Sequence, residues 1–405
     1  MRWVGEEELD RVAETRWMCY AHANKELARF KEHLHADPWG GPGDYLLAER
    51  DGQAVGTATG LPFNLWVRGS PISCQGVAYV GTIKSARRRG GSEPGIASAV
   101  MHEILGKARE REQVVSLLAP FRASFYEHFG YGVVERRAQW TIPLSVLPAG
   151  ECDGWRLSTP ADHRAYCDQW QAAVVAGQCD IERSAGRWKY LRAREDDAMV
   201  FIDRPTSNGP VRGGAFIAQE TVNDRRIVKV HEWSACSPDE LVRLLSFLGT
   251  LRDQFSAAAI TVQADVPVNR LLREPQVPHR PVDHPTPEVR CFTRMQARIL
   301  DHKRFLESLH LPANGKGRVS VAIMETEGNV SRFALEFEAG RAQVTTASGT
   351  TGIECLDRHW AAIATGDLPA SQAVRWGFAR QNTAGAAEVL DILAAGPGPC
   401  CRESF

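Results

Sequence analysis

The sequence has no long hydrophobic run and almost no net charge, and both absences narrow the functions that it can have. No apolar run approaches the roughly 18 residues that a membrane-spanning helix needs. The formal net charge is −1, so the chain lacks the broad basic field that is typical of nucleic-acid binding. The first residues are acidic and polar and lack the apolar core of a signal peptide. We therefore expect a cytoplasmic protein without membrane or nucleic-acid partners.

Cysteine is present, but in no pattern that is typical of zinc sites. The ten cysteines are scattered, and none forms a Cys-x-x-Cys pair. In a cytoplasmic chain most of them are expected to be reduced, buried, small hydrophobic residues. Only the adjacent Cys400 and Cys401 stand out. The twelve histidines are also dispersed, and the sequence predicts no metal site.

The length of 405 residues is enough for two or three domains, and the first region alternates helices with strands. Apolar residues spaced three or four apart predict helices near 7–20 and 96–111. Apolar runs bounded by turn signals predict strands near 44–67 and 74–83. A stretch with proline and glycine marks a boundary near residue 148.

The remaining sequence repeats this theme more loosely and then changes character. Residues 149–287 contain several strand-like runs and a helical stripe capped by Ser237. From residue 288 onward, alternation at period two around residues 327–329 predicts a β-hairpin. Helices are expected at 294–309, 357–365 and 384–394. The pattern as a whole favours an α+β protein in three parts.

A basic loop lies between a predicted strand and a predicted helix. The run "VAYVGTI" (77–83) is followed by "RRRG" (87–90) and then by the helical pattern from Ile96. A helix N-terminus exposes N–H groups and a partial positive charge, and neighbouring arginines add direct charge, so the arrangement suits a phosphate group. Basic loops are also common on ordinary surfaces, and the motif alone does not specify a cofactor.

The wider context of this loop resembles one family of enzymes. "VAYVGTI…RRRG" before a helix resembles the acyl-CoA loop of GNAT-fold N-acetyltransferases, and "SFYEHFGYG" (124–132) resembles the segment after the fifth strand of that fold. Over essentially its whole length the chain is similar to the enhanced intracellular survival (Eis) family. The resemblance implies an α+β fold of tandem GNAT-like domains, each a mixed sheet flanked by helices, at 1–148 and 149–287. A sterol-carrier-like α+β domain is implied at 288–405.

The resemblance also implies an activity and its catalytic residues. It implies an N-acyltransferase that moves an acetyl group from acetyl-CoA to a primary amine of a small molecule such as an aminoglycoside, and a hexameric assembly. Tyr126 matches the family's general acid, with a packed aromatic residue beside Phe125 and Phe129 as the alternative. Phe405 matches the residue whose main-chain carboxylate serves as the general base, with a frayed chain end as the alternative.

Further residues are assigned to binding by the same resemblance. Val80 and Thr82 would offer backbone groups to the pantetheine arm, and Arg87, Arg88, Arg89 and Gly90 match the pyrophosphate loop. Three more are expected to bind the substrate: Tyr79 beside the strand contacts, Trp39 as a wall of the pocket, and Glu403 as an attraction for a cationic amine. Packing is the alternative role for both aromatic residues.

One feature departs from the family pattern. The family's loop runs from RRRG directly into the helix, whereas five extra residues, Gly91–Gly95, intervene here. Ser92 is a good N-cap, and Glu93 and Pro94 would then occupy the first turn, where an acid competes with a phosphate and proline lacks an N–H donor. Three alternatives stay open: CoA binds with the insertion directed outward, the scaffold catalyses a reaction without CoA, or the chain is a non-catalytic ligand-binding protein.

Overall fold

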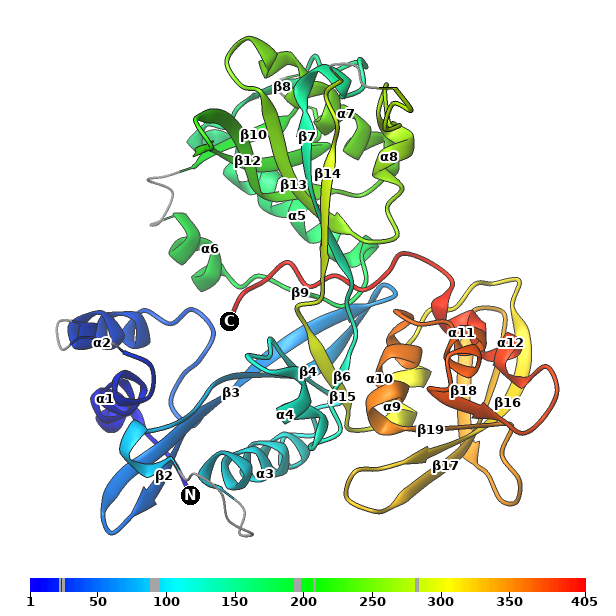
Figure 1. Cartoon of the computed structure of the whole chain (residues 1–405). Helices are drawn as coiled ribbons and strands as arrows, with labels where there is room; N and C mark the ends of the chain where they lie inside the picture. Colours follow the sequence, from blue (N-terminus) through cyan, green and yellow to red (C-terminus); the bar gives the residue numbers. More distant parts are fainter. Residues whose placement is uncertain (22, 24–25, 88–94, 193–197, 207–208, 281–283) are drawn as a thin grey trace.

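Three β-sheets, each accompanied by helices, organise the chain (Figure 1). The computed structural model describes residues 1–405 with the exception of 22, 24–25, 88–94, 193–197, 207–208 and 281–283. The three lobes of Figure 1 correspond to the three sheets, with the second sheet in the upper lobe. An α+β fold in three parts is therefore present, as the sequence predicted.

The first sheet has the strand order β1-β2-β3-β4-β5-β15-β6, and β9 pairs with β3 away from this path. Its strands are β1 Arg2–Trp3, β2 Tyr45–Arg50, β3 Gln53–Val67, β4 Ser70–Thr82, β5 Val115–Leu118, β6 Gly132–Val133, β9 Asp180–Ile181 and β15 Gln296–Ile299. Its helices are α1 Leu9–Tyr20, α2 Leu27–His35, α3 Ile96–Glu110 and α4 Ala123–Glu127.

The second sheet has the order β14-β7-β13-β12-β11-β10-β8. Its strands are β7 Arg137–Pro143, β8 Trp155–Leu157, β10 Met199–Asp203, β11 Gly213–Val222, β12 Arg225–Ala235, β13 Ala257–Gln263 and β14 Glu288–Phe292. Its helices are α5 His163–Ala176, α6 Ala185–Arg192, α7 Pro238–Gly249 and α8 Val268–Leu271. The predicted cap of α7 is confirmed, because the Ser237 side chain accepts a hydrogen bond from the Glu240 amide.

The third sheet has the order β18-β17-β16-β19-β20. Its strands are β16 Lys316–Met324, β17 Val330–Glu338, β18 Arg341–Thr346, β19 Ile353–Leu356 and β20 Ala379–Gln381. The helices of this region are α9 His302–Glu307, α10 Asp357–Thr365, α11 Ala370–Arg375 and α12 Ala386–Leu390. The hairpin predicted around residues 327–329 is confirmed, with Met324 opposite Val330 at its end.

Four strands cross between the domains that the sequence predicted. β7 precedes the expected boundary at residue 148 and β14 follows the one at residue 287, but both lie in the second sheet, where β7 pairs with β13 and β14. β9 follows the boundary at 148 and β15 follows the one at 287, but β9 pairs with β3 and β15 lies between β5 and β6, both in the first sheet. The first and second sheets therefore each contain two strands from beyond the predicted limits, and the structural boundaries differ from 148 and 287.

The helix predicted over 294–309 is wrong in its first half. Residues 296–299 form β15, and only His302–Glu307 are helical. All four residues of β15 are buried, since the strand is paired on both sides. Tertiary pairing overrides the local helix preference here, because two neighbouring strands satisfy the backbone N–H and C=O groups.

The last residues connect all three lobes. Figure 1 shows the segment after α12 running from the third lobe between the other two and ending beside the first. Along this path the Cys400 amide donates to the Gln178 carbonyl at 2.8 Å, and Arg402 pairs with Asp180 at 2.6 Å. The chain end is thus held by hydrogen bonds and an ion pair rather than frayed.

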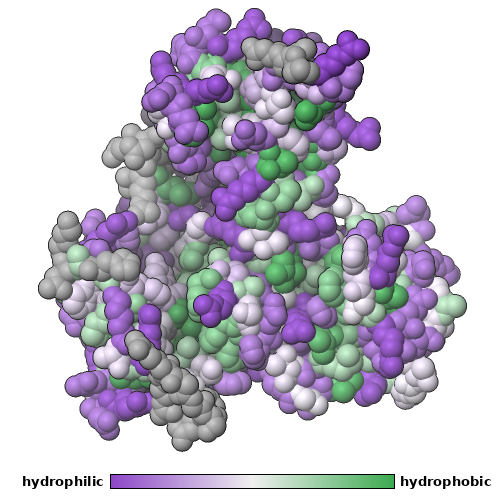
Figure 2. Space-filling model, viewed as in Figure 1, coloured by the Kyte–Doolittle hydropathy of each residue, from purple (hydrophilic) through white to green (hydrophobic). Residues whose placement is uncertain are grey.

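The surface polarity, the helices and the cysteines can be compared with what the sequence predicted for them. In the view of Figure 2, polar residues dominate, and apolar residues lie in separate patches among them. Among the described residues, no helix is long and apolar enough to cross a membrane. All ten cysteines lie in the described part of the chain and are unpaired thiols; Cys401 is buried, whereas Cys236 and Cys291 are exposed.

Candidate active site

A cavity of about 460 Å³ lies where the first sheet opens, and it collects residues from distant parts of the sequence. Its walls come from α1, α2, β4, the segment from β5 to α4, and the last residue of the chain. Tyr79, Val80, Tyr126 and Phe405, four of the residues predicted for the site, all line it.

The cavity exists because β4 and β5 stop pairing. The two strands are parallel and in register from Cys74 opposite Val115 to Val77 opposite Leu118. β5 ends there, whereas β4 continues to Thr82. Beyond Val77 the edge of β4 that faces the cavity pairs with no strand of the described chain. Its backbone groups are available to an extended ligand that binds like an added strand.

A β-bulge shapes the same stretch of β4. Thr57 pairs with Gly81 and Thr59 pairs with Ala78, so two residues of β4 lie opposite Ala58. One of these two is Tyr79, whose φ of 52° lies in the left-handed region that a tyrosine rarely adopts. Such strain persists only where the surrounding structure imposes it, and it turns the strand at the point where the cavity begins.

Tyr126 is well placed to hold a proton at the cavity wall. It lies in α4, is buried, and packs edge-to-face against Phe125 with ring centroids 5.0 Å apart. Burial raises the pKa of the Tyr126 phenol to about 12. The hydroxyl is therefore protonated throughout the neutral range and can donate a proton to a departing anion.

Phe405 is anchored in the cavity by its ring. The ring packs edge-to-face against Phe63 at 4.9 Å, and Phe63 packs in the same manner against Trp39 at 4.9 Å. Trp39 therefore supports the chain end from behind instead of forming the cavity wall that the sequence predicted. The stack fixes the position of the last residue relative to Tyr126.

The predicted role of Glu403 is corrected by the structure. Its side chain is fully buried and does not line the cavity. One carboxylate oxygen accepts from Arg183 and the other accepts from Arg187 at 2.9 Å. With both oxygens occupied by arginines, Glu403 has no charge to offer an ammonium group, and it instead clamps the chain end against the second domain.

The start of the predicted cofactor loop is tied to the backbone. Thr82 ends β4, and its carbonyl accepts from Arg87 Nε at 3.1 Å. Another nitrogen of the same guanidinium donates to the Cys19 carbonyl at 3.1 Å. Arg87 thus braces the loop onto α1 with two of its nitrogens. The predicted pyrophosphate residues Arg88, Arg89 and Gly90 lie outside the described residues.

The helix after the predicted cofactor loop begins where its apolar pattern predicted. α3 starts at Ile96 with Gly95 as its N-cap, whereas the sequence had suggested Ser92 for that position. No acidic residue lies in the first turn of α3. The N–H groups and the partial positive charge at the start of α3 therefore have no competing carboxylate within the helix. Gly91–Pro94 themselves lie outside the described residues.

Sequence reasoning missed the basic side of the cavity. Arg16 of α1 and Arg29 of α2 both line it. Arg16 is 3% exposed, donates to Thr59 Oγ1 at 2.6 Å, and lies over the Tyr79 ring at 3.9 Å from its centroid. A signal was present in the sequence, because Arg16 follows Val12 by four residues and therefore shares the apolar face of α1.

The second sheet contains a corresponding opening, in which a tryptophan side chain bridges the two separating strands. β12 and β13 are parallel neighbours only from Ile227 opposite Ala257 to Lys229 opposite Ala259. Beyond this point the Trp233 indole donates to the Thr261 carbonyl at 2.8 Å and bridges the two strands. A cavity of about 810 Å³ remains beside them, lined in part by Cys400 and Arg402 of the chain end. The catalytic candidates gather in the first domain alone.

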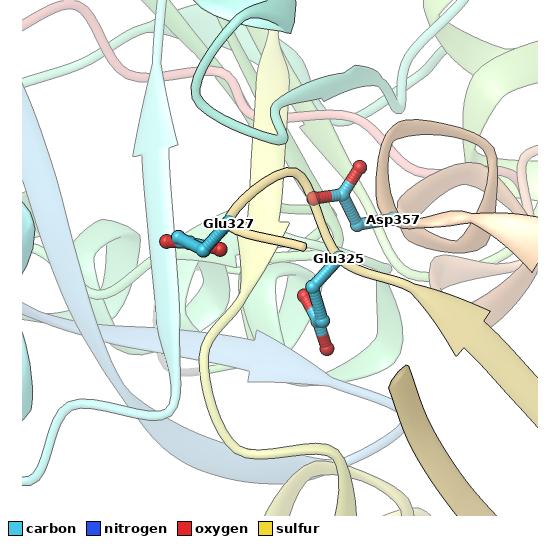
Figure 3. Close-up of side chains that lie close together, drawn as sticks. All are labelled: Glu325, Glu327 and Asp357. Carbon is cyan, nitrogen blue, oxygen red and sulfur yellow. The ribbon is translucent and has the colours of Figure 1, made fainter. Parts of the chain in front are cut away.

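Three carboxylates lie close together where the first and third domains touch, and ion pairs and hydrogen bonds with neighbouring residues account for their clustering. Figure 3 shows Glu325 and Glu327 on the turn after β16 and Asp357 at the start of α10. Arg298 pairs with Glu327, His302 lies 2.8 Å from Glu325, and Asp357 accepts from the Thr326 amide at 2.7 Å. This cluster is a junction held by ion pairs.

Comparisons with known proteins agree with this geometry. Residues 1–134 match one acetyltransferase (GNAT) domain family, and residues 179–299 match a second. The chain therefore belongs to the GNAT acetyltransferases and is an acyltransferase with two GNAT domains. No curated protein matches the sequence.

Solved structures define the architecture more closely. A GCN5-related N-acetyltransferase from Anabaena variabilis superposes with a TM-score of 0.82 at 16% identity, over 100% of this chain and 99% of that one. Eis1 from Mycobacterium abscessus gives 0.79 at 18% identity, over 100% and 99%. A conserved protein of unknown function from Enterococcus faecalis, described as a probable N-acyltransferase, gives 0.78 at 20% identity, over 99% and 98%. In fold the chain is an Eis-like GNAT protein.

Proposed function

We propose that the chain transfers an acetyl group from acetyl-CoA to a primary amine of a small molecule. The observation that carries this proposal is the meeting of Tyr126 and Phe405 in one cavity at the point where β4 and β5 separate. A proton donor and the last residue of the chain, 279 positions apart by subtraction of their numbers, reach the same site through the path of the chain end.

Two features of the first domain support CoA as the acyl donor. The unpaired edge of β4 at Val80 and Thr82 offers main-chain groups to the amides of a pantetheine arm. The first turn of α3 offers N–H groups and no acid to a pyrophosphate. Arg88 and Arg89 would add direct charge at the same place. The sequence had suggested that the insertion Gly91–Gly95 puts an acid into the first turn of the helix, where it would compete with the pyrophosphate. The first turn of α3 contains no acid, so this objection to CoA binding does not hold.

The residues of the cavity suit the proton transfers of acetyl transfer. Bound acetyl-CoA supplies a thioester for the amine to attack, with the CoA thiolate as leaving group. The main-chain carboxylate of Phe405 accepts the proton that the amine gives up. Main-chain N–H groups of β4 donate to the thioester oxygen, where negative charge develops. Tyr126 Oη gives its proton to the departing sulfur.

Tyr126→Phe tests the proton donor. We expect the variant to bind acetyl-CoA but to lose roughly a hundredfold in kcat, measured as release of CoA thiol with a panel of amines. Tyr166→Phe is the matched control, because Tyr166 is a buried tyrosine of the second domain whose hydroxyl has no hydrogen-bond partner among the described residues. Equal activity of both variants would remove Tyr126 from the chemistry.

Calorimetric titration with CoA separates the proposal from its two alternatives. A protein that catalyses a reaction without CoA, or one that only binds a ligand in its third domain, would not bind CoA at the β4 edge. The third domain has a core filled by its own side chains, such as Leu335 and Ile353, both fully buried. This packing favours a structural role for that domain over ligand binding.

Two further properties implied by the family resemblance belong to this proposal. We propose that the third domain is of the sterol-carrier type, which is supported by its five-stranded sheet with helices packed against it. We also propose a homo-hexamer as the assembly, and light scattering after size exclusion tests it. An aminoglycoside is one acceptor to include in the amine panel.

A further inference from the structure

Arg16 is a buried cation that forms no ion pair within the described part of the chain, although the Asp37 carboxylate attracts it at longer range. Of its three guanidinium nitrogens only Nη2 has a hydrogen-bond partner among the described residues, the hydroxyl of Thr59. No carboxylate in that part of the chain forms an ion pair with it. Other buried arginines of this protein are paired: Arg137 with Glu135 at 2.7 Å, and Arg183 with Glu403 and Glu232.

The surroundings of Arg16 stabilise its charge only in part. The guanidinium lies between two aromatic rings, at 3.9 Å from the Tyr79 centroid and 5.2 Å from the Tyr45 centroid. Cation–π contacts compensate some of the lost hydration. An arginine does not lose its proton in a protein, so an unpaired buried guanidinium remains unfavourable until an anion reaches it.

Arg16 faces the place where an acceptor must bind. It lines the same cavity as Tyr126 and Phe405, on the wall that α1 and α2 contribute. A second arginine of this wall, Arg29, is exposed at the cavity. Glu26 is the acidic side chain among the described lining residues, and it already has a partner. The wall that α1 and α2 contribute therefore carries two arginines against one glutamate, and the main-chain carboxylate of Phe405 is the further anion of the same cavity.

We propose that the acceptor amine also carries a carboxylate, as amino acids do, and that Arg16 binds this carboxylate. The planar fork of a guanidinium matches a carboxylate, and binding would supply the anion that the buried charge lacks. The amine at the other end of the same molecule would then lie toward Phe405 and Tyr126. This inference rests on the proposed function and narrows its substrate class.

Matched pairs of acceptors test the inference. Each amino acid of a panel is compared with its methyl ester and with the amine that remains after formal loss of the carboxylate, for example lysine with cadaverine. We expect the wild-type protein to favour the carboxylate member by about tenfold to a hundredfold in kcat/KM. In Arg16→Met this ratio should fall to about one because the loss falls on the carboxylate member alone. Arg16→Lys keeps the positive charge but lacks the planar pair of guanidinium N–H donors, so it should retain part of the preference for the carboxylate member.

Controls separate this effect from a loss of folding. Arg11→Met removes an arginine from the same helix at an exposed ion pair with Glu49, and it should leave the ratio unchanged. Arg16 forms no ion pair, so replacing it leaves no buried charge without its partner. Arg16→Met should therefore keep the thermal midpoint of the wild type. A large loss of stability together with an unchanged ratio in Arg16→Lys would show that Arg16 is structural.

The outcomes distinguish this inference from the proposed function. If CoA is released with neutral amines and esters as readily as with amino acids, acetyl transfer stands and the carboxylate site is wrong. If no amine is acetylated, the proposed function fails. In that case calorimetry measures the affinity of the protein for each amino acid and for its methyl ester. Equal affinities would show that Arg16 does not bind the carboxylate, and this test needs no catalytic activity.

Discussion

At the scale of single residues, burial determines which groups can exchange protons. The phenol of Tyr126 has its pKa raised to about 12 because it is packed among Phe125, Phe121 and Tyr131. The opposite case is Glu403, an acid that would be a proton acceptor in water but is neutralised by two arginines. Exposure and partners, rather than residue type, separate a chemical role from a structural one.

The raised pKa of Tyr126 predicts the alkaline limit of activity. The protonated phenol is the active form, and its pKa lies above the ordinary value of 10, so activity is retained through pH 10 and falls only as pH approaches about 12. A pH profile of kcat up to the limit of folding measures this. A descending limb centred at pH 9 would show that another group controls the reaction.

The clamp at Glu403 predicts a loss of stability. Glu403→Gln leaves the buried charges of Arg183 and Arg187 less well neutralised, and breaking such a pair costs about 3–5 kcal/mol. Urea unfolding should show the loss, and kcat should fall with it because Phe405 loses its anchor. Glu388→Gln, at an exposed position of α12, serves as the control and should unfold like the wild type.

The candidate site could be predicted from the sequence only in part. The resemblance identified Val80, Tyr126 and Phe405, the position of Tyr79 beside the strand contacts suggested that residue, and all four line one cavity. It could not reveal Arg16, because the absence of a counter-ion is a property of neighbours that lie elsewhere in the sequence. Glu403 was misassigned for the same reason, since its arginine partners belong to another domain.

At the scale of elements, the start of α3 decides what the cofactor loop can bind. The first turn, from Ile96, contains no acid and is preceded by Gly95 in an extended conformation. The apolar pattern placed the start of this helix at Ile96, as observed, whereas the preference of Ser92 for the N-cap position would place the cap three residues before Gly95. The position of a helix N-cap depends on how the helix packs as well as on the capping preference of a single side chain.

A charge at this turn should separate helix stability from CoA affinity. Ala97→Glu adds an acid that interacts favourably with the helix dipole, so the thermal midpoint should stay the same or rise. The same charge should weaken CoA binding about fivefold, corresponding to about 1 kcal/mol near a helix terminus. Calorimetry measures the affinity, with Ala97→Gln as the neutral control. Unchanged affinity in Ala97→Glu would place the pyrophosphate elsewhere.

Most elements follow from local pattern, and the exceptions share a cause. The hairpin of β16 and β17, the helix α10 and the capped α7 have periodic apolar faces that local sequence reveals. β15 was read as helix because its alternation of polar and apolar residues, from Gln296 to Ile299, spans only four residues and is followed at once by a helical pattern. So short an alternation does not distinguish a strand from the start of a helix, and the pairing on both sides decides it.

At the scale of the whole molecule, the chain end links the three domains to one site. Phe405 reaches its cavity because Arg402 pairs with Asp180 of β9 in the first sheet, Glu403 pairs with Arg187 of α6 in the second lobe, and Phe63 receives its ring. The site therefore depends on the relative positions of all three lobes.

Extension of the chain by one residue tests this dependence. Adding a glycine after Phe405 moves the terminal carboxylate by about 3.5 Å while the ring can keep its place against Phe63. A rate loss of around a hundredfold is expected, with little change in the thermal midpoint. Steady-state kinetics of the extended protein give the answer. Full activity would show that the main-chain carboxylate of Phe405 is not the base.

The exchange of β7 and β15 between the sheets also limits how such a protein can be recombined. The first sheet combines strands before β7 with β9 and with β15, and the gene encodes β15 some 150 codons after β7. A single crossover before the end of β15 would therefore join part of the first sheet of one protein to the rest of that sheet from another. Inheritance of one of these two sheets intact without the other requires more than one crossover.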